Sequence, residues 1–159
     1  MTEWTHVGDW SGLPDLRTDP VGKPGDDAMA TRGELVELRV EAAQESLPLV
    51  RTMAGAVAMR SDYDIDAIAD LKLVADEICT MLIHRAEPGA RLCGRFTLLP
   101  GSLTFGVSVR VTDPAPIRPD TLTWRLLTAL VDSVATTVNT GPGAPELSIE
   151  VQMTRRSGL

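Results

Sequence analysis

The sequence predicts a two-layer α/β sandwich in which three helices cover one face of a mostly antiparallel sheet, in the order β-α-α-β-β-α-β. The candidate strands are apolar at every second residue, so each buries one face and leaves the other in water. The candidate helices carry apolar residues at three- and four-residue steps, so each buries one stripe. Strands and helices of this kind pack as two layers.

The first strand and two helices are marked by periodicity and by capping residues. The first strand is expected to begin at Glu34, because Val36, Leu38 and Val40 alternate with Glu37, Arg39 and Glu41, which is typical of a half-buried strand. Ser46 is a candidate N-cap for a helix that runs to about Ser61. Asp64 is a candidate N-cap for a second helix that ends near Ala86, before a Pro-Gly pair.

The second half of the domain begins with two strands, at 91–99 and 103–112, joined by Pro-Gly, which suits a type II turn. A third helix is expected next, followed by a last strand. The helix has one stripe of apolar residues and the strand has one apolar face; the residues are Trp124, Leu127, Val131, Val134 and Val138 in the helix, and Leu147, Ile149, Val151 and Met153 in the strand.

Length and charge limit what the chain can be. Its 159 residues fit one domain, predicted at residues 34–155, after a Gly- and Pro-rich N-terminal extension at 1–33 and before a short tail at 156–159. A net charge of -7 argues against direct binding to nucleic acid and favours a basic protein partner. No apolar run is long enough for a membrane span, and no secretory signal is recognised, so a cytoplasmic protein is expected.

A carboxylate lies at the edge of the apolar face of the second helix. At about 100° per residue, Asp70, Glu77 and Met81 share that edge, and Met81 follows Glu77 by one turn. Two cysteines, Cys79 and Cys93, lack metal-ligand spacing. They are interpreted as two free, mostly buried thiols, with a regulatory disulfide as the alternative.

The segment ADLKLVADEICTMLIHRA resembles the first nucleotide-binding box of the anti-sigma-factor serine kinases, which belong to the GHKL or Bergerat-fold ATPases. That box reads roughly D-L-x-L-A-V-x-E-A-x-x-N-A-I. Asp113 lies where the family has a D-x-G-x-G loop, and TWRLLTALVDSV resembles the last box. The resemblance covers residues 34–155 and implies a divergent member of actinobacterial type.

The resemblance also implies roles for individual residues. Glu77 would be the catalytic base, and Asp113 would bond the adenine amino group. Arg51, on the first helix, lies where family members often carry an arginine used in partner contact. Each has a plainer alternative: a boundary carboxylate held by hydrogen bonds for Glu77, a loop aspartate before proline for Asp113, and a solvated arginine for Arg51.

The sequence departs from the family at three nucleotide contacts. Met81 replaces the metal-binding asparagine, and a soft thioether is a poor ligand for Mg²⁺. Pro114, Ala115 and Pro116 replace the flexible glycines of the second box. Thr121 and Thr123 replace glycines that would admit phosphate, and are good capping residues instead. These departures predict a degenerate ATP pocket, no metal site and no required cofactor, with Met81 serving packing.

The leading hypothesis is therefore an anti-sigma factor that sequesters an alternative, stress-type sigma factor and is released by an anti-anti-sigma antagonist. The resemblance implies that it works as a homodimer. One alternative is an active serine kinase that uses ATP and Mg²⁺ to phosphorylate the antagonist. The other is an unrelated α/β scaffold protein.

Overall fold

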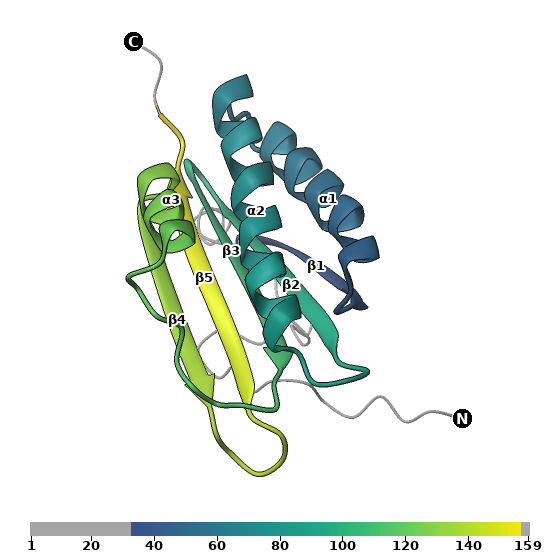
Figure 1. Cartoon of the computed structure of the whole chain (residues 1–159). Helices are drawn as coiled ribbons and strands as arrows, with labels where there is room; N and C mark the ends of the chain where they lie inside the picture. The colour runs from purple at the N-terminus through teal and green to yellow at the C-terminus, as the bar shows by residue number, and fades with distance from the viewer. Residues whose placement is uncertain (1–32, 157–159) are drawn as a thin grey trace, which may run out of the picture. The chain divides into compact units, whose positions relative to one another are not determined.

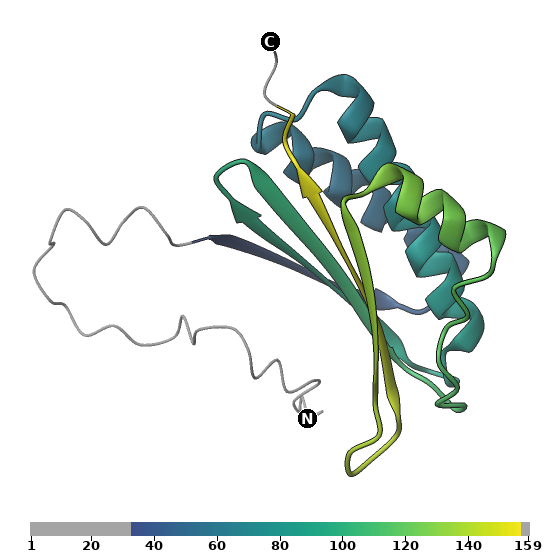
Figure 2. The ribbon, with the colours of Figure 1, turned by 90° about the vertical axis from the view of Figure 1, so that its left-hand side faces the viewer.

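The structure is a computed structural model that describes residues 33–156. Nearly all of the predicted extension (1–33) and tail (156–159) lies outside these residues. A five-stranded antiparallel sheet in the order β1-β2-β3-β5-β4 is covered on one face by three helices, so the predicted fold class is confirmed (Figures 1 and 2). In chain order the elements are β1 (Glu34–Glu41), a 3-10 turn η1 (Gln44–Ser46), α1 (Leu47–Arg60), α2 (Ile65–Arg85), β2 (Arg91–Leu99), β3 (Ser102–Arg110), α3 (Leu122–Leu130), β4 (Ser133–Asn139) and β5 (Glu146–Thr154).

The core lies between the sheet and the helix layer. In its central row Val36 pairs with Phe96, Phe96 with Phe105, and Phe105 with Val151. The rings of Phe96 and Phe105 stack with centroids 4.4 Å apart, and both residues are fully buried. The opposite face carries the alternate, mostly polar residues, as the period of two predicts.

The helix α2 occupies the middle of the helix layer, between α1 and α3 (Figure 1). Its start is the predicted one, since the Asp64 side chain accepts a hydrogen bond of 2.8 Å from the N–H of Ala67. Ser46 precedes α1 but does not cap it with its side chain. Because η1 runs directly into α1, the Ser46 backbone is already helical, with φ -83° and ψ -17°.

The predicted third helix is too long, and one strand was missed. The helix α3 ends at Leu130, and Val134 and Val138 belong to β4, so the order is β-α-α-β-β-α-β-β. Valines spaced by three and four residues fit a helix, but four of the five residues 134–138 have β-branched side chains, which favour strands. Pairing with β5 decides between the two, because it satisfies the backbone hydrogen bonds of this segment.

Candidate functional site

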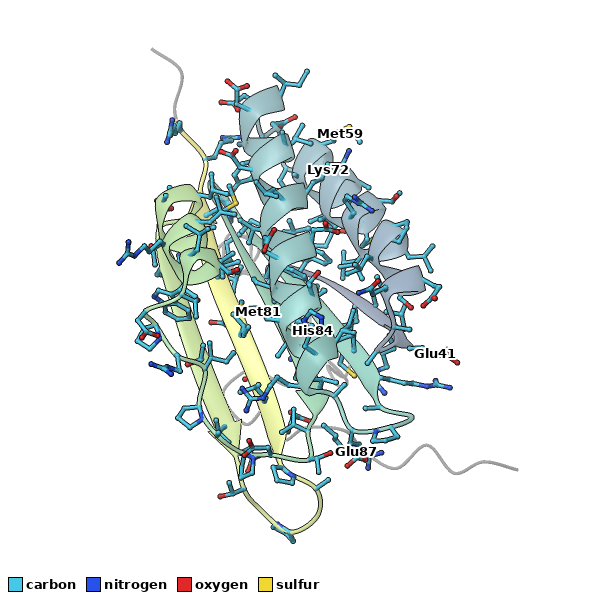
Figure 3. The ribbon with its side chains drawn as sticks, viewed as in Figure 1. Glu41, Met59, Lys72, Met81, His84 and Glu87 are labelled. Carbon is cyan, nitrogen blue, oxygen red and sulfur yellow. The ribbon has the colours of Figure 1, made fainter. Side chains whose placement is uncertain are left out.

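The predicted site residues come from three segments: the second half of α2, the loop from 111 to 121, and the first turn of α3. Figure 3 places Met81 on the side of α2 that faces α3 and β5, and His84 on the same half of the helix. The labelled Glu87 follows the end of α2, where the chain turns toward β2 (Figure 3). The site therefore lies around the C-terminal half of α2.

Glu77 and Met81 lie at the boundary between core and solvent, as predicted. Both are half-buried, and so is Asp70. The Met81 side chain packs against the hydrophobic core. A methionine in this place supplies apolar contact and a soft sulfur, neither of which holds a hard cation. Among the described residues no hydrogen bond holds the Glu77 carboxylate, and its role stays a prediction.

The loop that contains Asp113 is fixed to the end of α2 by an arginine. The Nη2 of Arg85 donates to the backbone oxygen of Asp113 at 3.1 Å and also to that of Ala115. Within the loop, Asp113 Oδ1 accepts the N–H of Ala115 at 2.9 Å. Arg85 was not singled out in the sequence, because its partners lie 28 and 30 residues away and are backbone oxygens.

Further bonds secure both sides of the same loop. The N–H of Glu87 donates to the oxygen of Arg110 at 2.9 Å, and Ala86 forms an isolated antiparallel bridge with Val111. The N–H of Val111 donates to the oxygen of Pro145 at 2.8 Å. The start of the loop is thus held between the end of α2 and the segment that leads into β5.

At the far end of the loop, the hydroxyl of Thr121 accepts the N–H of Trp124 at 3.2 Å and caps α3. The capping role proposed for Thr121 is therefore observed, and Thr123 lies half-buried in the first turn. Ile117, in the middle of the loop, packs against the core. An apolar side chain thus occupies the inner side of the loop.

The resemblance to GHKL ATPases implies ATP and Mg²⁺, and the side chains present do not fit them. Mg²⁺ requires oxygen ligands in near-octahedral geometry, whereas Met81 offers sulfur. One oxygen of Asp113 and the hydroxyl of Thr121 are already bonded to their own backbone. Within residues 33–156 there is no group of three or more His, Cys, Asp or Glu residues that could hold a metal ion.

The predicted partner residue Arg51 lies exposed on α1, facing α2. Its Nε is 3.8 Å from Oδ1 of Asp76, an oxygen that is buried and has no hydrogen-bond partner among the described residues. That ion pair is long and half in solvent, so it restrains Arg51 only weakly. Asp76 was not predicted, because the pairing of α1 with α2 has no local sequence signal.

The two cysteines are free and lie on opposite sides of the sheet. Cys79 faces the core from α2, where burial, with a smaller effect of the nearby Asp76 carboxylate, raises its pKa to about 12. Cys93 is half-buried on the outer face of β2, and burial raises the pKa of its thiol. A disulfide between them would require the layers to separate, so the free-thiol interpretation fits the fold.

A small cavity of about 90 Å³ lies at the other end of α2. Its walls include Asp66 and Asp70 from α2 and Asp132, Thr154 and Arg155 from the ends of α3 and β5. The Asp132 carboxylate accepts the N–H of Thr154 at 2.5 Å, which ties these segments together. The cavity is separate from the residues around Met81.

None of the helices between residues 33 and 156 is long and apolar enough to cross a membrane.

Comparison with known proteins gives a direct indication of ancestry. No model of a known protein family matches the sequence. The anti-sigma-F factor RsbW of Mycobacterium tuberculosis, in each of two strains, is 38% identical over 127 residues, which cover 76% of this chain and 74% of that protein. The serine-protein kinase RsbW of Bacillus velezensis is 34% identical over 58 residues, 36% of each chain.

Proposed function

Since the chain belongs to the RsbW family of anti-sigma factors, we propose that it binds and sequesters an alternative, stress-type sigma factor and is released by an anti-anti-sigma antagonist. The observation that carries this proposal is the 38% identity to a protein named as an anti-sigma-F factor over three quarters of both chains. Sequestration of a sigma factor requires a folded binding surface and no catalysed reaction. It is therefore compatible with a sulfur side chain, Met81, at the position where the resemblance implies a Mg²⁺ ligand.

The edge of α1 that borders α2 and carries Arg51 is the surface we propose for partner contact. Arg51 is exposed there and its ion pair with Asp76 is long, so its guanidinium is accessible to a partner carboxylate. Met59, two turns further along the same helix, is 60% exposed and adds apolar surface. The net charge of -7 suits a partner whose binding surface is basic overall.

We further propose that the protein works as a homodimer in the cytoplasm. The support is its family membership, because an anti-sigma factor meets its partner where transcription takes place. Light scattering on the purified chain tests the dimer: a mass of two chains, independent of dilution in the micromolar range, is expected. A single-chain mass at all concentrations would refute this part alone.

Co-purification tests the main proposal. The tagged full chain is incubated at low salt with each alternative sigma factor of the same organism, and we expect one to be retained. Arg51→Ala should weaken that complex at least tenfold, whereas Arg125→Ala, an exposed arginine on α3, should leave it unchanged. Retention of no sigma factor would overturn the proposal, and equal affinity of both variants would remove Arg51 from the surface.

A second candidate function is a serine kinase that phosphorylates the antagonist. Glu77 at the helix boundary and the partial similarity to a serine-protein kinase favour it. Incubation of the chain with radiolabelled ATP, Mg²⁺ and purified antagonist provides the test. Transfer that is lost in Glu77→Gln would establish the kinase, and no transfer above the level without enzyme would reject it.

A further inference from the structure

The loop from Asp113 to Pro116 has almost no backbone donor left for a ligand. Pro114 and Pro116 have no N–H group. The N–H of Ala115 is bonded to the side chain of Asp113 at 2.9 Å. Of the four residues, only Asp113 keeps a backbone N–H that is not spent within the loop.

Two backbone acceptors of the same loop are also engaged. The Nη2 of Arg85 donates to the backbone oxygens of both Asp113 and Ala115. Ile117, which follows these four residues, packs against the core. Hydrogen bonds from Arg85 and the apolar packing of Ile117 thus both hold this part of the chain.

We infer that Arg85 takes over the fixing role that nucleotide would have at this loop, so that this chain folds and holds its partner without ATP and Mg²⁺. This rests on the proposed function only where it concerns the partner. The release of the sigma factor is then governed by competition between the two proteins, with no phosphate transferred by this chain.

Nucleotide binding tests the inference directly. The full chain is heated with 5 mM ATP and excess Mg²⁺, with EDTA as control, and we expect a melting temperature within about 1 °C of the nucleotide-free value. A ligand at about 50 times its Kd would raise it by roughly 5–10 °C. A rise of that size, with a saturable titration by calorimetry, would overturn the inference.

Hydrogen exchange tests the role of Arg85. In Arg85→Gln the amides of Val111 and Ala115, whose N–H groups are hydrogen-bonded, should exchange at least about tenfold faster, because the variant loses the charged donor to two backbone oxygens of the loop. In the matched variant Arg125→Gln the same amides should be unchanged. Arg85→Lys, which keeps a charged donor on a differently shaped side chain, should lie between them and is the fallback if the glutamine variant does not fold. Unchanged exchange in Arg85→Gln would refute the role.

Capture of the sigma factor separates this inference from the proposed function. If a sigma factor is captured equally with and without ATP, and unphosphorylated antagonist displaces it, both stand. If capture requires ATP, only the inference fails. If no sigma factor is captured while nucleotide still has no effect on the melting temperature, only the proposed function fails.

Discussion

Replacing Met81 by asparagine introduces the amide that the resemblance implies for this position, and the burial of Met81 sets the expected cost in stability. Removing a fully buried methionine side chain costs about 2–5 kcal/mol, and Met81 is only half-buried, so the packing loss is roughly 1–2 kcal/mol. Partial burial of the new amide adds up to about 1 kcal/mol. We expect Met81→Asn to lose roughly 1–3 kcal/mol and 3–10 °C in melting temperature.

The same variant should not hydrolyse ATP. The loop at the predicted nucleotide site has prolines that lack N–H groups, and its Ala115 N–H is already bonded. Calorimetric unfolding and a phosphate-release assay measure the two effects. Met59→Asn, a change of the same kind at a site that is 60% exposed on α1, should stay within about 0.5 kcal/mol of the parent. ATP turnover in Met81→Asn, or a stability loss equal to that of the control, would refute the reasoning.

Three further predictions follow from burial and charge. Cys93 should react with a maleimide in the folded protein while Cys79 does not, because Cys79 is fully buried and has a pKa of about 12. Mass spectrometry of partially alkylated protein locates the adduct, and early labelling of Cys79 would contradict this prediction. Tyr63→Phe should cost about 1–2 kcal/mol in denaturant unfolding, because it leaves the oxygen of Met153 without the buried 2.8 Å hydrogen bond from the hydroxyl; no loss would show that water replaces it. Glu146→Gln should be more stable than the parent at pH 7 and equally stable below about pH 4. Burial raises the pKa of Glu146, so its charged form disfavours folding, and this penalty disappears as the carboxyl is protonated. A stability difference that stays constant across pH would argue for an effect of packing instead.

The strands and helices that depend on local pattern were predictable. Residues 36–41 alternate apolar and charged side chains, and Asp64 precedes an amphipathic segment, so each choice is made within a few neighbouring residues. The segment from Val131 to Val138 was not decided locally, since its valines fit both a helix and a strand. Only pairing with β5, which comes later in the chain, distinguishes the two.

The candidate site was predictable in composition and not in its bonds. The resemblance to the family's nucleotide-binding boxes identifies four candidate residues, Glu77, Met81, Asp113 and Thr121. The prolines at 114 and 116 indicate that the loop differs from the family's glycine-rich loop. The hydrogen bonds from Arg85 connect residues about 30 positions apart. Their acceptors are backbone oxygens, which every residue has. Side-chain patterns contain no information about such acceptors, so only the folded geometry reveals them.

The position of β5 affects how the protein folds while it is being synthesised. Within the described residues β4 pairs only with β5, and β5 also supplies the second neighbour of β3, although β5 is the last strand in the sequence. During synthesis, β1, β2 and β3 can therefore pair early as a three-stranded antiparallel sheet, while α3 and β4 emerge without the strand that places them. A nascent chain that lacks β5 leaves one edge of β3 unpaired, and this stage is the one at which aggregation or the help of a chaperone is expected.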